Sequence, residues 1–265
     1  MSLRVAVIGV GGLSWSLAPA LRAAGIELVG LYGPAGPNAE ALSELVSAPH
    51  FRWPAALPEN TEVIWLAVPD DSLQQVSDDI ACQKSSLSPD ILLVHSSGAT
   101  PIEAIAREGF RAAVVYPLAS FTRGQVLDLS LYPIFYEADN LIGDTALQLA
   151  RALSENSQPL GSEQRLVLHV GAVWANNFSN LMLSCAGDLM QRAGLPVDAR
   201  VYLPLMRGMI DKLELLSPEE AQTGPARRGD HQTLVRHREL VRQLASEIEP
   251  LYNSLSDEIE RRYRL

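Results

Sequence analysis

The sequence predicts a doubly wound α/β domain with a mostly parallel sheet, followed by an all-α domain. Apolar, β-branched segments alternate with helix-like segments over residues 1–161, which is the pattern of parallel strands joined by crossover helices. A glycine-rich turn follows the first of these strands at Gly9. From Glu163 onward the pattern favours helices alone, so we expect a domain boundary near Gly161 and a second domain over residues 162–265.

The expected strands are short runs, and all but residues 51–53 and 131–136 are rich in aliphatic residues. They cover residues 3–8, 26–32, 51–53, 62–68, 91–95, 112–116 and 131–136. Each run is followed directly by glycine, proline or a polar residue, which fits the ends of buried strands.

The expected helices are marked by residues that begin helices, because Asp, Ser and Thr side chains accept hydrogen bonds from the first turn. Such residues are Asp70 or Asp71, Thr100, Asp198, Ser217 and Asp230. The helices cover residues 17–24, 39–46, 70–81, 141–153, 163–193, 198–216, 231–246 and 248–263, with further helices beginning at Thr100-Pro101 and Ser217-Pro218. Pro19 falls inside the first helix and should kink it or shift its start.

The composition is that of a globular protein, with 47% hydrophobic and 20% charged residues. The net charge of −10 argues against a general surface for nucleic acid or anionic membranes. The two cysteines form no CxxC pair, the histidines have no metal-ligand spacing, and no G-x-S-x-G hydrolase motif occurs. The chain begins directly with a strand rather than a signal peptide. We therefore expect a cytoplasmic protein without a resident metal.

The glycine-rich turn after the first strand has the features of a Rossmann-like, dinucleotide-binding βαβ unit. Gly9 lets the chain turn sharply, and Gly11 has no Cβ, so a pyrophosphate can approach the backbone. The N–H groups that begin the next helix, around Gly12 and Leu13, would face that anion. Ser14 replaces the usual third glycine and is small enough for close packing. The structural alternative is a tight turn that binds nothing.

The end of the second strand is where such folds meet the adenosine ribose. An acidic residue there indicates NAD, and a nearby arginine indicates NADP. The segment from Gly33 to Asn38 contains neither, and Tyr32 and Asn38 are the polar groups near the expected ribose. The local sequence therefore leaves open whether the cofactor is NAD or NADP.

Ligands of open α/β sheets bind beyond the carboxyl ends of the strands. Besides the glycine turn, the loops expected there are Val68-Pro69-Asp70, His95-Ser96-Ser97-Gly98 and Tyr116 to Phe121. Val68 and Pro69 would pass near the adenosine or pyrophosphate, and Ser97 and Gly98 near the nicotinamide. Each loop alone is typical of a strand end, but their joint position at one edge of the sheet indicates a site.

The helix expected over residues 163–193 is apolar almost all round, so it should be buried. His169, Asn176 and Asn180 share one stripe at 3.6 residues per turn, and Asn177 flanks it. Buried polar side chains need hydrogen-bond partners. Either a network between helices or a pocket that faces the cofactor would supply them, and the sequence leaves both open.

Near the C-terminus, Arg228 stands in a loop beside Asp230. A guanidinium binds carboxylates and phosphates bidentately, so Arg228 is a candidate clamp for a substrate anion. The structural alternative is that Asp230 caps the next helix while the arginine is solvated.

Together these motifs resemble a family that joins an N-terminal Rossmann-like domain to a C-terminal helical domain of unknown function. Its members are usually labelled NADP-dependent or deazaflavin-dependent oxidoreductases. The matching segments are residues 7–11, 68–70, 95–98 and 116–121, His169 with 177–178, and 223–225 with 228–230. The architecture is also similar to pyrroline-carboxylate reductase, ketopantoate reductase and the 6-phosphogluconate dehydrogenase group. That resemblance implies a helical domain that forms a homodimer and closes a cleft over the nicotinamide.

The chain departs from these relatives at three places. The family usually has histidine at the position of Tyr116, and a Ser-Arg-like pair at the position of Gly33-Pro34. The ketopantoate reductase and hydroxyacid dehydrogenase relatives use a lysine on the long helix as acid catalyst, and residues 163–193 contain no lysine. The resemblance to NADP-dependent oxidoreductases alone favours NADP over NAD, and the missing Ser-Arg-like pair argues against that preference.

We thus expect a NAD(P)-dependent oxidoreductase that transfers a hydride between the nicotinamide and a carbonyl or imine carbon of a small polar substrate in the interdomain cleft. His169 would donate a proton or polarise the substrate, Asn177 and Asn180 would position it, and Arg228 would clamp an anionic group. The alternative is a sensor or scaffold that binds a dinucleotide without turnover. The missing lysine, Tyr116 in place of histidine and the absence of a ribose-reading residue favour this alternative.

Overall fold

The computed structural model describes residues 2–88, 90–138 and 143–263. It divides into two compact units, residues 1–172 and 173–265, which we call the sheet unit and the helical unit. The division falls inside the segment expected as one long helix, residues 163–193, so the first ten residues of that segment belong with the sheet unit.

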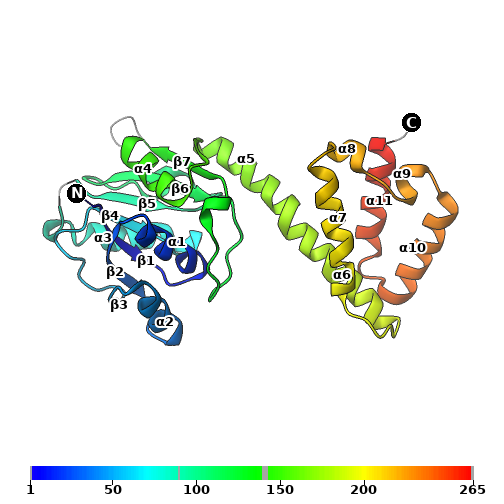
Figure 1. Ribbon diagram of the computed structural model, residues 1–265, viewed down its shortest axis with the longest axis horizontal. Helices are drawn as coiled ribbons and strands as arrows, with labels where there is room; N and C mark the ends of the chain where they lie inside the picture. The colour runs from blue at the N-terminus through cyan, green and yellow to red at the C-terminus, as the bar shows by residue number, and fades with distance from the viewer. Residues whose placement is uncertain (1, 89, 139–142, 264–265) are drawn as a thin grey trace. The chain divides into compact units, whose positions relative to one another are not determined.

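The sheet unit contains one eight-stranded sheet, in the order β3-β2-β1-β4-β5-β6-β7-β8 (Figure 1). Its strands are β1 (Arg4–Ile8), β2 (Glu27–Gly33), β3 (His50–Arg52), β4 (Val63–Leu66), β5 (Leu92–His95), β6 (Arg111–Pro117), β7 (Ile134–Ala138) and β8 (Ser157–Pro159). All neighbouring strands are parallel except β6 and β7. The strand order reverses between β1 and β4, so the carboxyl ends of these strands form the topological switch point where such sheets bind ligands.

The predicted α/β fold class is confirmed, and the seven expected strands are present with small shifts at their ends. The eighth strand, β8, was not predicted, because Ser157-Gln158-Pro159 has no apolar run to mark it. It pairs with the edge strand β7, where a proline at the strand end is tolerated.

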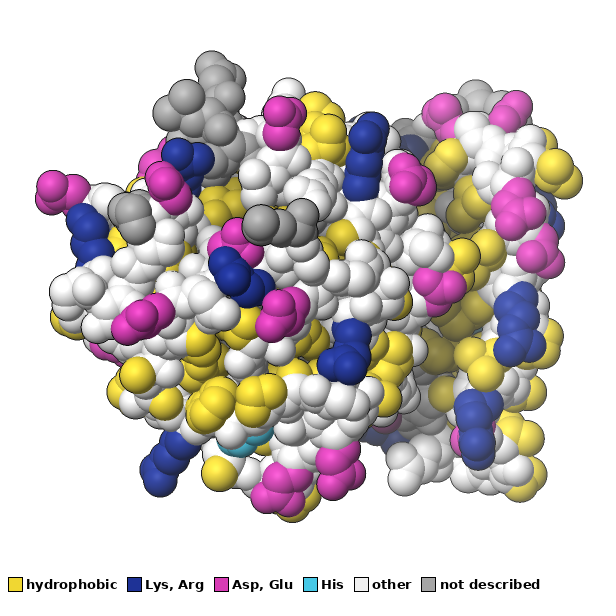
Figure 2. Space-filling model, turned by 60° about the vertical axis from the view of Figure 1, so that its left-hand side comes forward, with side chains coloured by type: hydrophobic (Ala, Val, Ile, Leu, Met, Phe, Trp, Pro, Cys, Tyr) yellow, Lys and Arg dark blue, Asp and Glu magenta, His cyan; other side chains and the backbone are white. Residues whose placement is uncertain are grey.

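Helices cover both faces of the sheet (Figure 1). The helices of this unit are α1 (Gly12–Ala23), α2 (Pro37–Val46), α3 (Leu73–Ala81), α4 (Gly143–Leu153) and α5 (Ser162–Ala172). Buried side chains of α1, α2 and α4 pack on one face, and those of α3 pack on the other. Residues 141–142 of the helix predicted from 141 lie outside the described residues. On the face that Figure 2 shows, acidic and basic side chains are interspersed rather than gathered by sign.

Two predicted helix starts are wrong, because the capping side chains have other partners. Asp70 precedes α3, but its carboxylate accepts a hydrogen bond from the Ser97 hydroxyl at 2.6 Å instead of capping the helix. Thr100-Pro101 leads only into a short 3₁₀ turn, Ile102–Ile105. The Thr100 N–H is bound by the Ser97 hydroxyl at 2.8 Å, so its loop folds back toward β5.

Pro19 lies inside α1, whose start at Gly12 is five residues earlier than expected. The helix thus begins directly at the glycine turn.

The helical unit begins with a π-helical segment, Val173–Phe178, and contains no strand among its described residues. Its helices are α6 (Ser179–Arg192), α7 (Leu203–Leu213), α8 (Pro218–Ala221), α9 (Pro225–Arg228), α10 (His231–Ala245) and α11 (Glu249–Tyr263). The predicted caps Asp198, Ser217 and Asp230 are confirmed, and Ser217 forms a capping box with Glu220. None of the helices in the described ranges is both long and apolar enough to cross a membrane.

The expected burial of the long helical segment is wrong for the single chain. Val167 is 74% exposed and Trp174 is 62% exposed, and other apolar side chains of α5 and α6 are also accessible. The stripe expected for His169, Asn176 and Asn180 on a regular α-helix is interrupted as well, because the π-helical segment changes the helical period. Asn176, Asn177 and Asn180 are exposed rather than buried.

Candidate functional site

The glycine turn has the geometry that a dinucleotide requires. Gly9 has a φ of +118°, and a Cβ there would overlap the Ala67 carbonyl group, so only glycine fits. The Ser14 hydroxyl donates to the Gly9 carbonyl at 2.8 Å and fixes the turn. Gly11 is the N-cap of α1, and a Cβ on it would meet nothing within 4 Å. A Cβ on Gly12, the first residue of α1, would instead lie 3.0 Å from the Phe121 carbonyl oxygen. The Gly11 side is therefore where an anion can approach the start of α1.

A cavity of about 260 Å³ lies next to this turn, at the carboxyl ends of the strands. Its lining brings together three of the loops predicted from the sequence and one side chain of α5. The lining residues are Leu13, Leu66, Val68, Asp70, Leu73, Ser96, Ser97, Gly98, Tyr116, Pro117, Ala119, Phe121 and His169. The expected meeting of these loops at one sheet edge is thus present within the sheet unit.

Helix α5 places His169 over this cavity. The Tyr116 hydroxyl at the end of β6 lies 3.1 Å from His169 Nδ1, and the two rings meet edge to face with centroids 6.0 Å apart. Gly98 allows the close approach of the imidazole, because a Cβ there would lie 2.5 Å from His169 Nδ1. A tyrosine hydroxyl and an imidazole in contact form a pair through which a proton can move.

Arg165 holds α5 in this position. It lies one turn before His169 and is 1% exposed. Its Nε donates to the Ser97 carbonyl at 3.1 Å, and one Nη donates to the Thr100 carbonyl at 2.7 Å. The other Nη forms a hydrogen-bonded ion pair with Glu137 of β7. A guanidinium that is buried and shared among several acceptors fixes both the loop after β5 and the helix that carries His169.

Glu137 also caps α5. Its carboxylate accepts hydrogen bonds from the Ser162 N–H at 3.0 Å and from the Ser162 hydroxyl at 2.7 Å. Burial alone would raise the pKa of Glu137, but the hydrogen bonds from Arg165 and Ser162 lower it below its ordinary value. The carboxylate is therefore charged, at the helix N-terminus where a negative charge is favourable.

Burial shifts the pKa of two further groups around the cavity, Tyr116 and His95. Burial raises the pKa of the Tyr116 hydroxyl, and the nearby Arg165 charge only partly offsets this, so Tyr116 stays protonated at neutral pH. His95 lies under the same loop and is fully buried. Burial and the Arg165 charge lower its pKa to about 4, so the ring is neutral and its Nδ1 accepts the Ser97 N–H at 3.1 Å.

Tyr32, at the strand end where the adenosine ribose is expected, differs from the prediction. Tyr32 is fully buried, stacked on Phe51 at 5.2 Å, so its ring offers no surface to a ribose. Burial raises the pKa of Tyr32 to about 12. Asn38 ties α2 to the glycine turn, since its amide donates to the Val10 carbonyl at 2.5 Å. Arg52 was not predicted; it is exposed and lies opposite Gly33 in the β2–β3 pairing.

The other predicted site residues belong to the helical unit. Asn177, Asn180 and Arg228 are all exposed there, and their roles stay predictions. Asp230 caps α10, because its carboxylate accepts from the Thr233 N–H at 3.1 Å, so the structural interpretation of this residue is the correct one. In the described part of the chain, no three His, Cys, Asp or Glu side chains come together where they could hold a metal ion.

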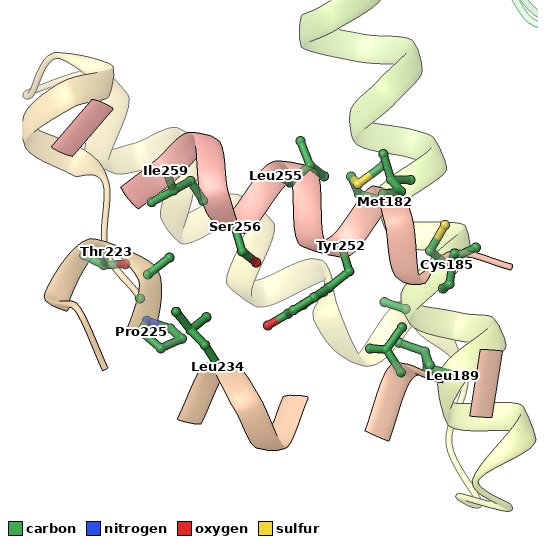
Figure 3. A pocket seen from close by; sticks show the side chains of 16 residues that line it. Met182, Cys185, Leu189, Thr223, Pro225, Leu234, Tyr252, Leu255, Ser256 and Ile259 are labelled. Atoms are coloured by element: carbon green, nitrogen blue, oxygen red, sulfur yellow. The ribbon is translucent and has the colours of Figure 1, made fainter. Parts of the chain in front are cut away.

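A second cavity, of about 380 Å³, lies within the helical unit between α6, α9, α10 and α11 (Figure 3). Its wall is almost entirely hydrocarbon, with Leu189, Leu234 and Leu255 among the lining side chains. The Tyr252 hydroxyl is bound to His237 Nδ1 at 2.9 Å. Because no carboxylate or cation lines this cavity, it has little to offer proton transfer, and the smaller cavity beside His169 is the candidate active site.

Comparison with known families confirms the expected resemblance. Residues 132–259 match the family described as a domain of unknown function, DUF2520. Among solved structures, the chain is similar to the "putative NADP oxidoreductase" of Bacteroides fragilis, with 27% identity, a TM-score of 0.88 and 98% coverage of both chains. None of the curated protein sequences matches the chain.

Two other solved structures share the fold at lower identity. The imine reductase of Myxococcus stipitatus, in complex with NADP⁺, is 13% identical, with a TM-score of 0.68 and coverage of 97% of this chain and 93% of that one. The reductive aminase of Aspergillus terreus, in complex with NADPH and ethyl-5-oxohexanoate, is 14% identical, with a TM-score of 0.69 and coverage of 100% and 96%. The fold is therefore a Rossmann-like domain followed by a helical part.

Proposed function

We propose that this protein, which carries a DUF2520 domain on a Rossmann-like fold, is a NAD(P)-dependent reductase of a small polar substrate with a C=N or C=O bond. The observation that carries the proposal is the position of His169. Helix α5 brings it against Tyr116 and Gly98, in a cavity that the glycine turn borders through Leu13. A proton donor beside a dinucleotide-binding turn is what carbonyl or imine reduction needs.

The residues present fit a nicotinamide dinucleotide. The open side of Gly11 and the start of α1 would hold the pyrophosphate, and Val68 would line its path. Ser97 and Gly98 would border the nicotinamide, which supplies the hydride when it is bound. The similarity to an NADP oxidoreductase, and the shared fold with reductases solved with NADP⁺ and NADPH, support the same cofactor class.

We further propose that the cofactor is NADP and that Arg52 binds its 2′-phosphate. Gly33 ends β2, and a Cβ there would lie 3.1 Å from a Val10 side-chain carbon, so this strand end lies against the glycine turn. Arg52 is the exposed cation opposite Gly33, on the neighbouring strand. A guanidinium recognises a phosphate in two-point contacts, and no acidic side chain stands on β2 beyond Glu27 to favour a free ribose hydroxyl.

The predicted roles of three polar residues in the helical unit stay part of the proposal. In this proposal Asn177 and Asn180 orient the substrate through their amides, and Arg228 binds an anionic group on it. Their exposure in the single chain leaves these side chains available for that role.

The protein is proposed to act as a homodimer through the helical unit. Large apolar side chains are exposed on the π-helical segment, α6 and α7, where a second copy would cover them. These are Trp174, Phe178, Leu181, Leu205, Met209, Ile210 and Leu213.

Sedimentation should give a dimer, and Trp174→Glu should give a monomer. Leu131→Glu replaces a leucine of the sheet unit that is 78% exposed, and this control should leave the dimer intact. A monomeric wild type would contradict the proposal.

The test of the function is a titration with NADPH and separately with NADH, followed by nicotinamide fluorescence, and then an assay with 2-methyl-1-pyrroline as a cyclic imine probe. We expect saturable binding and loss of absorbance of the reduced dinucleotide. His169→Ala should lower turnover while leaving dinucleotide affinity unchanged. Binding without turnover would instead support the sensor or scaffold, and absence of binding would remove the basis for both.

A further inference from the structure

The hydrogen bond between Tyr116 and His169 suggests that these side chains have different roles in one proton transfer. Tyr116 is 7% exposed, and it lines the candidate active-site cavity together with His169. His169 Nδ1 is engaged by the Tyr116 hydroxyl at 3.1 Å, so this nitrogen reaches a substrate only through the tyrosine. His169, the proton donor expected from the sequence, is thus hydrogen-bonded to a second side chain that can carry a proton.

We propose that Tyr116 is the catalytic acid that gives its proton to the substrate, and that His169 replenishes this proton through Nδ1. The inference rests on the proposed function, and it adds the residue that touches the reacting atom. Tyr116 is the catalytic residue in this scheme, and His169 acts through it.

For an imine substrate, one hydride and one proton are transferred in the step. A hydride from the reduced nicotinamide dinucleotide forms a C–H bond at the imine carbon, and the C=N π electrons move to nitrogen. Nitrogen takes the proton of the Tyr116 hydroxyl, and the phenolic oxygen takes the proton of the His169 imidazolium at Nδ1. The products are the amine, the oxidised dinucleotide and neutral His169, which regains a proton from solvent.

The chemistry of tyrosine explains why the pair is needed. A buried phenol that keeps its proton at neutral pH is a weak acid on its own. An adjacent imidazolium removes this difficulty, because it returns a proton to the oxygen as the first proton leaves. The active form therefore carries one proton more than the neutral pair.

The charges around the pair favour this arrangement. Asp70 lines the same cavity as His169, and its carboxylate accepts a hydrogen bond from the Ser97 hydroxyl at 2.6 Å. The negative charge of this carboxylate attracts a cationic imidazolium. The positive charge of Arg165 disfavours a cationic imidazolium at His169, but the ion pair with Glu137 largely compensates this charge. His95 beneath the loop is neutral and adds no charge.

Kinetics of single and double variants test the relay, with 2-methyl-1-pyrroline and NADPH as probes. Tyr116→Phe keeps the ring and removes the hydroxyl, so kcat should fall about a hundredfold or more, while KM and the dinucleotide Kd stay unchanged. His169→Ala should cause a similar loss, and the double variant should be no slower than either single one, because the two residues act as one unit. Tyr136→Phe removes a hydroxyl from β7 outside the cavity and should leave kcat unchanged.

The pH profile provides a further readout. In the wild type, log kcat should decline with rising pH with a slope of about −1 once the extra proton is lost, and this decline should be absent in Tyr116→Phe. If Tyr116→Phe keeps roughly a third or more of kcat, or if the two losses add in the double variant, the relay is overturned while the proposed reductase stands. If the wild type binds NADPH but reduces no imine or ketone, the relay and the proposed function both fall.

A measurement without turnover tests the same hydrogen bond. The ring nitrogens of the five histidines are observed by ¹⁵N NMR, and His169 is assigned from the spectrum of His169→Asn. At high pH the Tyr116 hydroxyl should donate to Nδ1, which places the ring proton on Nε2. The Nδ1 signal should shift in Tyr116→Phe and stay in place in Tyr136→Phe. An unshifted Nδ1 signal in Tyr116→Phe would overturn the proposal.

Discussion

His95 should make the sheet unit sensitive to acid. It ends β5 directly below the loop that borders the active-site cavity, and none of its surface is exposed. Burial and the charge of Arg165 lower its pKa from 6.5 to about 4. Protonation would place a second cation beside the buried guanidinium, so the folded protein resists it.

The size and sign of the effect follow from linkage. The unfolded state takes up a proton on this histidine near pH 6.5, whereas the folded state does so only near pH 4. The stability that neutral His95 provides is therefore fully present above pH 6.5 and is lost as the pH falls toward 4. A single group with these two pKa values contributes a loss of about 2 kcal/mol by pH 5 and about 3 kcal/mol below pH 4.

The assay compares urea unfolding of the wild type and His95→Asn at pH 7.5 and pH 5.0. The asparagine carbonyl can accept the Ser97 N–H that His95 Nδ1 accepts at 3.1 Å. Tryptophan emission reports mainly on the sheet unit, because Trp15, Trp53 and Trp65 lie there and only Trp174 belongs to the helical unit.

The stability that the wild type loses between the two pH values should exceed the loss in His95→Asn by about 2 kcal/mol, since all other groups titrate equally in both proteins. His231→Asn, which removes an exposed imidazole of the helical unit, serves as the control. Equal losses in the wild type and His95→Asn would refute the reasoning.

Four other substitutions separate stability from cofactor binding. Arg165→Met removes the clamp on the β5 loop and leaves Glu137 without its partner, so the free energy of unfolding of the sheet unit should fall by about 3–5 kcal/mol in urea. Arg52→Ala should raise the Kd for NADPH about tenfold or more and leave the Kd for NADH unchanged, measured by nicotinamide fluorescence. Gly9→Ala should lower the thermal midpoint, because its φ is +118° and its Cβ would overlap a carbonyl. Gly11→Ala, with open space around its Cβ, should keep the midpoint but weaken binding of both dinucleotides.

Local chemistry allowed much of this fold to be predicted from the sequence. A strand such as β1 or β4 is a continuous apolar run that ends at glycine or proline, and each such run has few alternatives to a buried strand. The glycine turn was equally readable, because the positive φ at Gly9 demands glycine. The caps at Asp198, Ser217 and Asp230 were predictable, because each side chain accepts a hydrogen bond from a backbone N–H two or three residues later.

Predictions failed where a residue's partner is distant in the sequence. Thr100 has the residue type of a helix cap, but its N–H donates to the Ser97 hydroxyl, and that hydroxyl is held in place by Asp70, 27 residues before Ser97. The sequence did not single out Arg165, because its ion-pair partner Glu137 is 28 residues away. One signal was available: Arg165 and His169 are four residues apart and so lie on the same face of a helix.

The placement of Arg165 links the stability of the sheet unit to the geometry of the site. Burying an ion pair is costly, and apolar side chains of similar volume often stabilise a fold as well or better. Here the guanidinium joins Glu137 at the start of α5 to the carbonyl groups of the β5 loop, and His169 follows one turn later. Its hydrogen bonds thus set the distance between α5 and the loop, on which the contact of His169 with Tyr116 depends. Arg165 is therefore a positioning residue, and its burial is explained better by the precision that proton transfer requires than by a gain in stability.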